Sequence, residues 1–254
     1  MFGVRDEGPV RWLTIDNQAR RNAIPFGGWA RLAGLIDDFA DGEPRVLVIT
    51  GAGEDFCSGA DMGSVSNGVA TNGYAVLTEV SGAAAALHRS AKPTVAAVDG
   101  VAVGAGMNLA LGCDVVIATD RARFSEIFVK RGLTIDFGGT WLLPRLVGMA
   151  RAKELALTGR MFGAEEAMSY GIVTEVVAPE DLAMAASQKA AELAGGAPLA
   201  QRFIKEGLDR SLEMSFGEAL AYERQAQSIL FRSEDVAEGV SAFLEKRPPE
   251  FKGR

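Results

Sequence analysis

Short apolar runs recur along the first two thirds of the chain, and most of them lack the alternation of a strand with one solvent-facing side. The clearest runs are VLVI (46–49), TVAAV (94–98), DVVIA (114–118) and IVTEVV (172–177). Runs of this kind are typical of strands that are buried on both faces, as in a parallel sheet. An earlier segment, VRWLTIDN (10–17), does alternate, and we expect it to form an antiparallel strand.

Helical patterns lie between these runs. They are WARLAGLIDDFA (29–40), the segment that ends before Lys92, MNLALGC (107–113), RAKELALTGR (151–160) and AEEAMS (164–169). Strands and helices that alternate along a chain pair in parallel through right-handed crossovers. The sequence therefore predicts an α/β fold.

The pattern changes near Gly195, after which we expect only helices. LAQRFIKEGLDRSLE (199–213) and GEALAYERQAQSILF (217–231) have helical spacing, and Ser233 is suited to cap a third helix. We therefore divide the chain into an α/β core, residues 1–195, and a helical region, residues 196–254. Such a region either caps its own core or packs on a neighbouring subunit, and its successive amphipathic helices favour an oligomer.

Composition argues against several classes of partner. The 254 residues carry a formal net charge of −7 and no basic run exceeds two residues, so we expect no nucleic-acid partner. No apolar run reaches the roughly 20 residues of a membrane span, and the N-terminus lacks the apolar stretch of a signal peptide. Cys57 and Cys113 lie far apart and in no metal-ligand spacing, which indicates a cytoplasmic protein without disulfides or a metal.

The single histidine, His88, lies in a predicted helix that ends near Lys92. It is either a catalytic base or a packing or surface residue. No Ser or Cys nucleophile pattern lies near it in the sequence, so we favour the second role. This argues against most His-dependent hydrolases.

Two glycine-dense loops follow predicted strands, TGAGEDFCSGAD (50–61) and DGVAVGAGMN (99–108). Neither has the third glycine and the later acid of a dinucleotide-binding loop, and there is no Walker A lysine, so we do not expect NAD or ATP. Gly104, Ala105 and Gly106 directly precede a predicted helix, where backbone N–H groups are free to bind an oxygen. Two such groups on one oxygen would form an oxyanion hole; alternatively, the glycines only permit tight packing.

Four motifs occur in an order that is typical of one enzyme superfamily. They are FCSGADM, DGVAVGAGMNLALGCDVVIA, FVKRGLTIDFGGTWLLPRLVG and ALTGRMFGAEEAMSYGIVTEVV. Over nearly the whole chain they resemble the crotonase (enoyl-CoA hydratase/isomerase) superfamily. The resemblance implies a superhelix of ββα turns, a C-terminal helical trimerisation region, a homotrimer or hexamer, and acyl-CoA thioester substrates without a further cofactor. It also implies that the N–H groups of Ala60 and Ala105 hold the thioester oxygen, and we expect Asp61 to fix the first of these loops.

The superfamily's hydratases use two glutamates, and neither is present here. The position after the glycine run holds Asn108, and the position four residues before Gly132 holds Phe128. An asparagine cannot exchange a proton near neutral pH. Glu126, two residues before Phe128, is a reserve candidate, although we expect it to be a solvated surface acid.

Asp136 is then the candidate catalytic acid and base. The segment FVKRGLTIDFGGTWLLPR (128–145) resembles the ring-epoxide isomerase of phenylacetate degradation and other enoyl-CoA isomerases, in which an acid near this position moves a proton along the acyl chain. We expect Asn108, Phe128, Phe137 and Trp141 to line the substrate pocket, where the aromatic residues raise the pKa of Asp136 and exclude water. The alternative is that Asp136 only caps the helix GTWLLPRL.

Three cations are candidates for binding the phosphates of coenzyme A: Arg20, Arg21 and Lys246. The superfamily often places a lysine after the GAD motif, but Gly63 stands there in this chain. The favoured function is an acyl-CoA isomerase that shifts a double bond or opens a ring epoxide through a thioester enolate. An enoyl-CoA hydratase and a non-catalytic acyl-CoA-binding protein are the alternatives.

Overall fold

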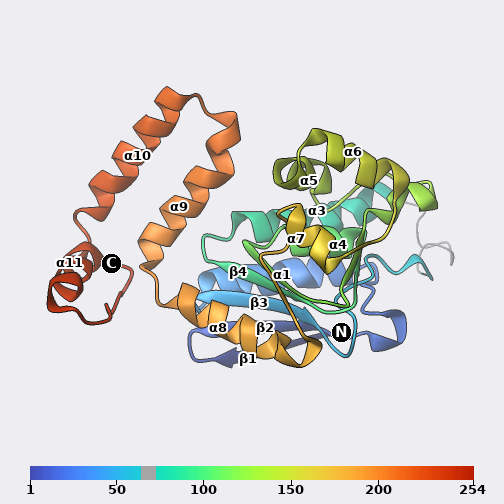
Figure 1. Ribbon diagram of the computed structural model, residues 1–254, viewed down its shortest axis with the longest axis horizontal. Helices are drawn as coiled ribbons and strands as arrows, with labels where there is room; N and C mark the ends of the chain where they lie inside the picture. Colours follow the sequence, from blue (N-terminus) through green and yellow to red (C-terminus); the bar gives the residue numbers. More distant parts are fainter. Residues whose placement is uncertain (64–72) are drawn as a thin grey trace.

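A six-stranded sheet forms the centre of the computed structural model, which describes residues 1–63 and 73–254 (Figure 1). Its strands, in spatial order, are β1 (Phe2–Glu7), β2 (Val10–Ile15), β3 (Val46–Gly51), β4 (Thr94–Val98), β6 (Val115–Thr119) and β9 (Glu175–Val177). β1 pairs with β2 antiparallel, and every later pair of neighbours is parallel. The predicted parallel sheet with an antiparallel strand at its start is confirmed.

The sheet is covered on both faces, and this explains why the apolar runs do not alternate. The covering helices are α1 (Gly28–Asp41) and α3 (Gly73–Arg89) on one face and α8 (Leu182–Ala194) on the other (Figure 1). On β3, Leu47 and Ile49 join the hydrophobic cluster beneath α1 and α3, whereas Val46 and Val48 join the cluster beneath α8. All four side chains are fully buried, so neither face of this part of the strand is open to solvent.

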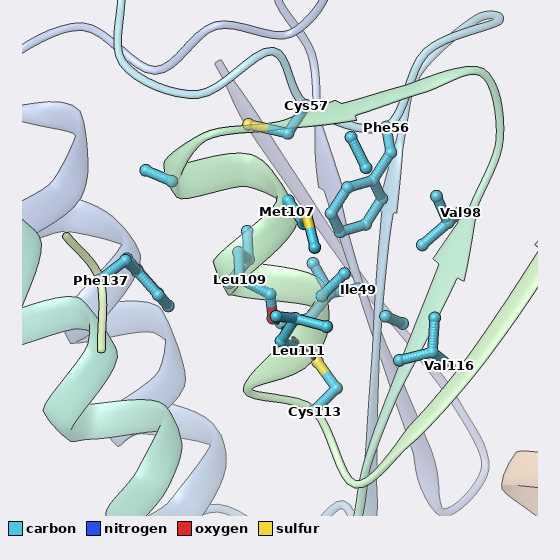
Figure 2. Packing of buried hydrophobic residues seen from close by; sticks show 14 of the residues in the cluster. Ile49, Phe56, Cys57, Val98, Met107, Leu109, Leu111, Cys113, Val116 and Phe137 are labelled. Atoms are coloured by element: carbon cyan, nitrogen blue, oxygen red, sulfur yellow. Dashed lines mark hydrogen bonds between the residues drawn. The ribbon is translucent and has the colours of Figure 1, made fainter. Parts of the chain in front are cut away.

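A second, smaller sheet gives the chain its superhelical path. It consists of β5 (Val101–Val103), β7 (Arg123–Ser125) and β8 (Phe162–Gly163). The chain alternates between the two sheets through β4, β5, β6 and β7; the helix α4 (Ala105–Leu111) follows β5 and the 3-10 helix η3 (Ile127–Arg131) follows β7. These are ββα turns, as the crotonase-like fold requires. Figure 2 shows α4 packing Met107, Leu109 and Leu111 beside Ile49 and Val116 of the large sheet.

Three further helices complete the core: the first two pack against α4 and η3, and the third packs against β7, β8 and β9. They are α5 (Gly139–Val147), α6 (Met149–Thr158) and α7 (Ala164–Ser169). The residue that starts α5, Gly139, is buried, because this helix begins directly against α4. The segment that carries Asp136 is the short connection from η3 to α5, so both helices determine its position.

The last three helices extend beyond the core as an arm. They are α9 (Pro198–Arg210), α10 (Phe216–Leu230) and α11 (Glu234–Glu245) (Figure 1). The predicted cap is present, since the Ser233 hydroxyl accepts a hydrogen bond from the Val236 N–H at 3.3 Å. Large apolar side chains are exposed on the arm: Ile204, Leu208, Leu212, Phe216, Ile229, Phe231, Val240, Phe243 and Leu244. None of the helices in the described part of the chain is both long and apolar enough to cross a membrane.

We predict that Gly106→Ala lowers the free energy of unfolding by about 2–3 kcal/mol, because an added Cβ would overlap the backbone carbonyl of Cys57. Gly34→Ala is the matched control, since Gly34 is exposed in α1 and its added Cβ meets no atom. This control should gain about 0.5–1 kcal/mol. Urea unfolding of both variants is the measurement, and equal stabilities would contradict a tight contact at Gly106.

Candidate active site

A pocket of about 440 Å³ opens where the two glycine-rich loops meet η3 and the Asp136 segment. Its lining includes Ala60, Ala105, Phe128 and Asp136, which come from four different parts of the chain. The sequence separates the first and last of these by 76 positions, and the ββα path brings them together. The pocket therefore contains both predicted N–H donors and the predicted acid.

The backbone at Ala60 and Ala105 is arranged to leave both N–H groups available. On either side of Ala60, the Gly59 carbonyl accepts from the Ile24 N–H at 2.8 Å and the Asp61 N–H donates to the Ile24 carbonyl at 2.9 Å. Ala105 is the first residue of α4, where no earlier turn supplies an acceptor. Within residues 1–63 and 73–254, neither N–H is donated to another group of the chain.

The loop that carries Ala60 is held in place on both sides. Gly59 adopts φ 88°, and a Cβ there would approach the Val103 carbonyl at 2.9 Å and the Ala105 nitrogen at 3.4 Å. This shows how closely the loop approaches the start of α4. The Asp61 carboxylate accepts a hydrogen bond from the Gly63 N–H at 2.9 Å, which is the loop-fixing role predicted for it.

Asp136 is not a helix cap. The N-cap of α5 is Gly138, without a side-chain hydrogen bond, and only the backbone carbonyl of Asp136 accepts from the Gly139 N–H, at 3.0 Å. The carboxylate atom Oδ1 is buried and has no partner. Burial raises the pKa of Asp136 to about 6. The interpretation of Asp136 as a helix cap is therefore wrong. Asp136 lines the pocket, and its side chain changes its charge close to neutral pH.

The next residue fixes the direction of Asp136. Phe137 adopts φ 49°, which is unusual for a residue with a side chain, and its ring is buried 5.5 Å from the ring of Trp29. This left-handed residue turns the chain so that Asp136 and Phe137 face different cavities. Asp136 lines the pocket described above, and Phe137 lines a neighbouring cavity of about 260 Å³.

Glu126 is fully buried, so its prediction as a surface acid is wrong. It is the N-cap of η3, and its Oε2 lies 3.4 Å from Nδ2 of Asn108. Burial, with a further contribution from the charge of Asp136, raises the pKa of Glu126 to about 8, although the Asn108 hydrogen bond acts the other way. Its position between buried Phe124 and Phe128 is the sequence signal that indicates burial.

The predicted pocket residues divide into two groups. Phe128 lines the pocket and packs near Gly104, whereas Asn108 lies fully buried behind it. Trp141 does not line this pocket. It lies on the side of α5 that faces α3, where the ring of His88 is 5.2 Å away and the Arg145 guanidinium stacks at 3.7 Å. His88 is exposed, contacts Trp141 and does not line the pocket, in agreement with the surface or packing role expected for it.

The candidate cations are also divided. Arg20 and Arg21 line the pocket mouth with exposed side chains, and Arg131, which the sequence interpretation missed, lies there too. Lys246 follows α11 in the arm and does not reach the pocket of its own chain (Figure 1). The segment that follows it returns to the start of β3, where the Arg45 guanidinium donates to the Phe251 carbonyl at 2.7 Å, and Lys246 is not in the lining of the pocket.

Ser58 lines the pocket, and its hydroxyl donates a hydrogen bond to the Arg20 carbonyl at 2.9 Å. Both cysteines are buried, and burial raises the pKa of each thiol to about 12. In the part of the chain that the structure describes, no three His, Cys, Asp or Glu side chains cluster in a way that would hold a metal ion. The arrangement is suited to proton transfer at Asp136 beside a pair of backbone donors.

Comparison with known proteins agrees with this architecture. Residues 6–254 match the family model described as enoyl-CoA hydratase/isomerase, and the chain belongs to that family. A Rhodobacter capsulatus protein named "probable enoyl-CoA hydratase" is 43% identical over 242 residues, covering 95% of this chain and 94% of the relative. The Escherichia coli 1,2-epoxyphenylacetyl-CoA isomerase is 40% identical over 253 residues, covering 98% and 97%. The crystal structure of a Bacillus anthracis enoyl-CoA hydratase superposes with a TM-score of 0.93 at 30% identity, covering 100% of this chain and 99% of that one.

We predict that Asp136→Asn makes the protein more stable at pH 7, by up to about 3 kcal/mol. The folded state raises the pKa of Asp136 from 3.8 to about 6, so it retains a proton that the unfolded chain loses. The contribution of Asp136 to the free energy of unfolding is fully present below pH 3.8, and it is lost as the pH rises towards 6. Urea unfolding at pH 4 and pH 7 should therefore show a larger loss in the wild type than in the variant. Equal losses would mean that Asp136 is well solvated.

Proposed function

We propose that this protein is an acyl-CoA isomerase that moves a double bond from the 3,4 to the 2,3 position of an enoyl-CoA. The observation that carries the proposal is Asp136, which lines the same pocket as Ala60 and Ala105 and whose Oδ1 is buried without a partner. One carboxylate is sufficient for this reaction, because the proton removed from C2 is the one returned at C4.

The steps follow from the arrangement of the pocket. The Ala60 and Ala105 N–H groups donate to the thioester oxygen, and the ionised Asp136 removes a proton from C2. The two electrons of the C2–H bond enter a dienolate, whose charge on the thioester oxygen is stabilised by the same two donors. Asp136 then donates its proton to C4, which leaves a conjugated 2-enoyl thioester. A pKa of about 6 leaves most Asp136 side chains ionised at pH 7 and ready to act as the base.

Hydration of a 2-enoyl-CoA is the second candidate, because the Rhodobacter capsulatus relative carries a hydratase name. Against it, the two positions that hold the hydratase glutamates have Asn108 and Phe128 here. Phe128 lines the pocket and gives a water molecule no partner there. The name of the Escherichia coli relative makes a ring epoxide a further substrate to test with the same acid. A non-catalytic acyl-CoA-binding protein would retain the two donors and make no use of Asp136.

We propose that the substrate binds through its coenzyme A moiety. Its phosphates require cations, and Arg20, Arg21 and Arg131 present exposed guanidinium groups at the pocket mouth. Arg20 lies 4.0 Å from Asp61 and Arg21 lies 3.8 Å from Asp55, both at the outer limit of an ion pair. Weak pairs of this kind leave the guanidinium groups available to a phosphate.

We predict that the protein raises the ultraviolet absorbance of 3-enoyl-CoA as the conjugated thioester forms, and that Asp136→Asn lowers kcat/KM for this change by about 10³-fold. The loss is expected because Asn cannot carry the proton from C2 to C4. Glu180→Gln is the matched control, since Glu180 is exposed on the surface far from the pocket in sequence and structure. It should leave the rate unchanged.

Two results would contradict the isomerase assignment. If absorbance falls with 2-enoyl-CoA and Asp136→Asn has no effect on that fall, the protein is a hydratase with other acids. If no acyl-CoA tested, including the ring epoxide, changes while titration still detects tight binding, the protein is a binding protein.

We also propose that the arm, defined as α9 to α11, packs on other copies of this chain. Leu208 is 67% exposed on α9, and Phe216 is 80% exposed at the start of α10. Apolar side chains of this size stabilise an interface by about 1.5–3 kcal/mol each when they are buried. A homotrimer or a hexamer would bury them, and would place the Lys246 of one copy near a neighbour rather than near its own pocket.

We predict that the Leu208→Glu variant is mainly monomeric at micromolar concentrations at which the wild type forms oligomers. The charge cannot be buried without a partner, whereas Arg202→Gln on the exposed side of the same helix should leave assembly unchanged. Sedimentation velocity measures the outcome. A wild type that sediments as a monomer, or a variant that remains fully assembled, would contradict a role for this face of α9.

A further inference from the structure

Glu126, Asn108 and Asp136 form a buried cluster that joins three elements of the fold. The Asn108 amide on α4 donates to Oε2 of Glu126 at 3.4 Å and to the backbone carbonyl of Asp136 at 3.0 Å. A backbone carbonyl can only accept, so its contact fixes which end of the Asn108 amide faces the pair. Both hydrogens of the amide nitrogen are then used, one for each acid residue.

The cluster has more acceptors than donors. One oxygen on each residue is buried without a partner: Asn108 Oδ1, Glu126 Oε1 and Asp136 Oδ1. If Glu126 were ionised, its carboxylate would be fully buried with a single neutral donor. A proton on Oε1 removes the charge and supplies a donor where only acceptors are present.

Among residues 1–63 and 73–254, no cation contributes to the electrostatics of Glu126. The seven residues of α4 include no ionisable side chain, and Lys130 and Arg131 of η3 are exposed to solvent. The remaining cations of the surrounding elements are exposed or have other partners: Lys153 of α6 is exposed, Arg123 of β7 contacts the Ala122 carbonyl, Arg145 of α5 contacts Glu213, Arg151 of α6 contacts Tyr170, and Arg160 contacts Glu154 and Glu166. Asp136 is the one ionisable group whose charge acts on Glu126 among the described residues.

The position of Asn108 affects the position of the segment that carries Asp136. Gly139 begins α5 directly on the Asn108 side chain, where an added Cβ would overlap the amide group. Asp136 precedes this contact by three residues and is also held by its own carbonyl. A shift of Asn108 would therefore move the start of α5 and the carboxylate of Asp136 together.

We propose that Glu126 is a positioning residue that works in its uncharged form: it holds Asn108, which holds Asp136, and it keeps a second negative charge away from the pocket. The inference rests on the isomerase proposal for the part that concerns turnover. Before proton transfer the pocket carries the charge of Asp136, and after transfer it carries the charge of the dienolate. An ionised Glu126 would be a buried charge with one neutral donor, and the rearrangement that solvates it would displace Asn108 and, through Asn108, Asp136.

The consequence is a bell-shaped dependence of kcat/KM on pH. The lower limb lies near pH 6, where Asp136 ionises, and the upper limb lies near pH 8, where Glu126 ionises. Between pH 8 and pH 9 the wild type should lose about tenfold in kcat/KM. Because the charge of Asp136 acts on Glu126, the two acids titrate together. Each limb of the pH profile therefore gives an apparent pKa of the pair and not of one residue.

Glu126→Gln tests the inference, because Gln retains a neutral oxygen for Asn108 and cannot ionise. We expect activity within a few-fold of the wild type at pH 7, a lower limb still near pH 6, and no upper limb below pH 9. Glu126→Met, which is neutral but offers Asn108 no comparable acceptor, should also lose the upper limb and should lower kcat at every pH. Glu180→Gln should reproduce the wild-type profile. An upper limb that persists in Glu126→Gln, or a lower limb displaced to lower pH, would overturn the inference.

An infrared measurement on the protein without substrate separates this inference from the isomerase proposal. A protonated buried carboxyl group has a C=O stretching band distinct from that of a carboxylate, and the wild type should show it at pH 7.5 and lose it by pH 9.5. Glu126→Gln should lack the band, whereas Asp136→Asn should retain it. If 3-enoyl-CoA is not converted, the isomerase proposal fails and this band still decides the state of Glu126. Absence of the band at pH 7.5 would overturn the inference, even if Glu126→Gln fails to fold.

Discussion

The contact between the Cys57–Ala60 loop and the start of α4 is the constraint on which the site depends. Cys57 behaves as an extra strand residue: its N–H donates to the Val101 carbonyl at 2.9 Å and its carbonyl accepts from the Val103 N–H at 3.1 Å. Gly106 permits the two backbones to meet because it has no Cβ. Since the proposed donors are backbone groups, their separation is determined by main-chain packing, and side chains around the pocket can vary without disturbing it.

This division of labour accounts for the relatives having different names on one fold. The chain shares most of its length with proteins named as hydratases and with one named as an isomerase. A backbone pair can polarise any thioester, so the reaction depends on where the acids lie. In this chain, Asn108 and Phe128 occupy the hydratase positions, and the ionisable groups are Asp136 at the pocket wall and Glu126 behind it.

Local patterns in the sequence were sufficient for the large sheet and for the start of the final helix, whereas the ββα turns were expected from the family resemblance. Runs without alternation predicted strands buried on both faces, and Ser233 predicted its helix start. The direction in which individual side chains point was harder to predict. Glu126 is predicted on the surface because an isolated acid is usually solvated, although its place between Phe124 and Phe128 indicates burial. Trp141 was placed in the pocket by proximity to Asp136 in sequence, although the left-handed turn at Phe137 separates their directions.

The backbone conformation of Phe137 links catalysis to the hydrophobic core. A left-handed φ of 49° costs a residue with a side chain about 1–2 kcal/mol, and burial of the ring against Trp29 offsets that cost. Glycine would adopt the turn more easily but would lose the anchor that stops the segment from rotating. Trp29 is buried in α1 and outside the lining of the Asp136 pocket, yet it helps to set the direction in which the acid points. Evolutionary drift in this part of the core is therefore expected to alter reaction specificity before it alters the fold.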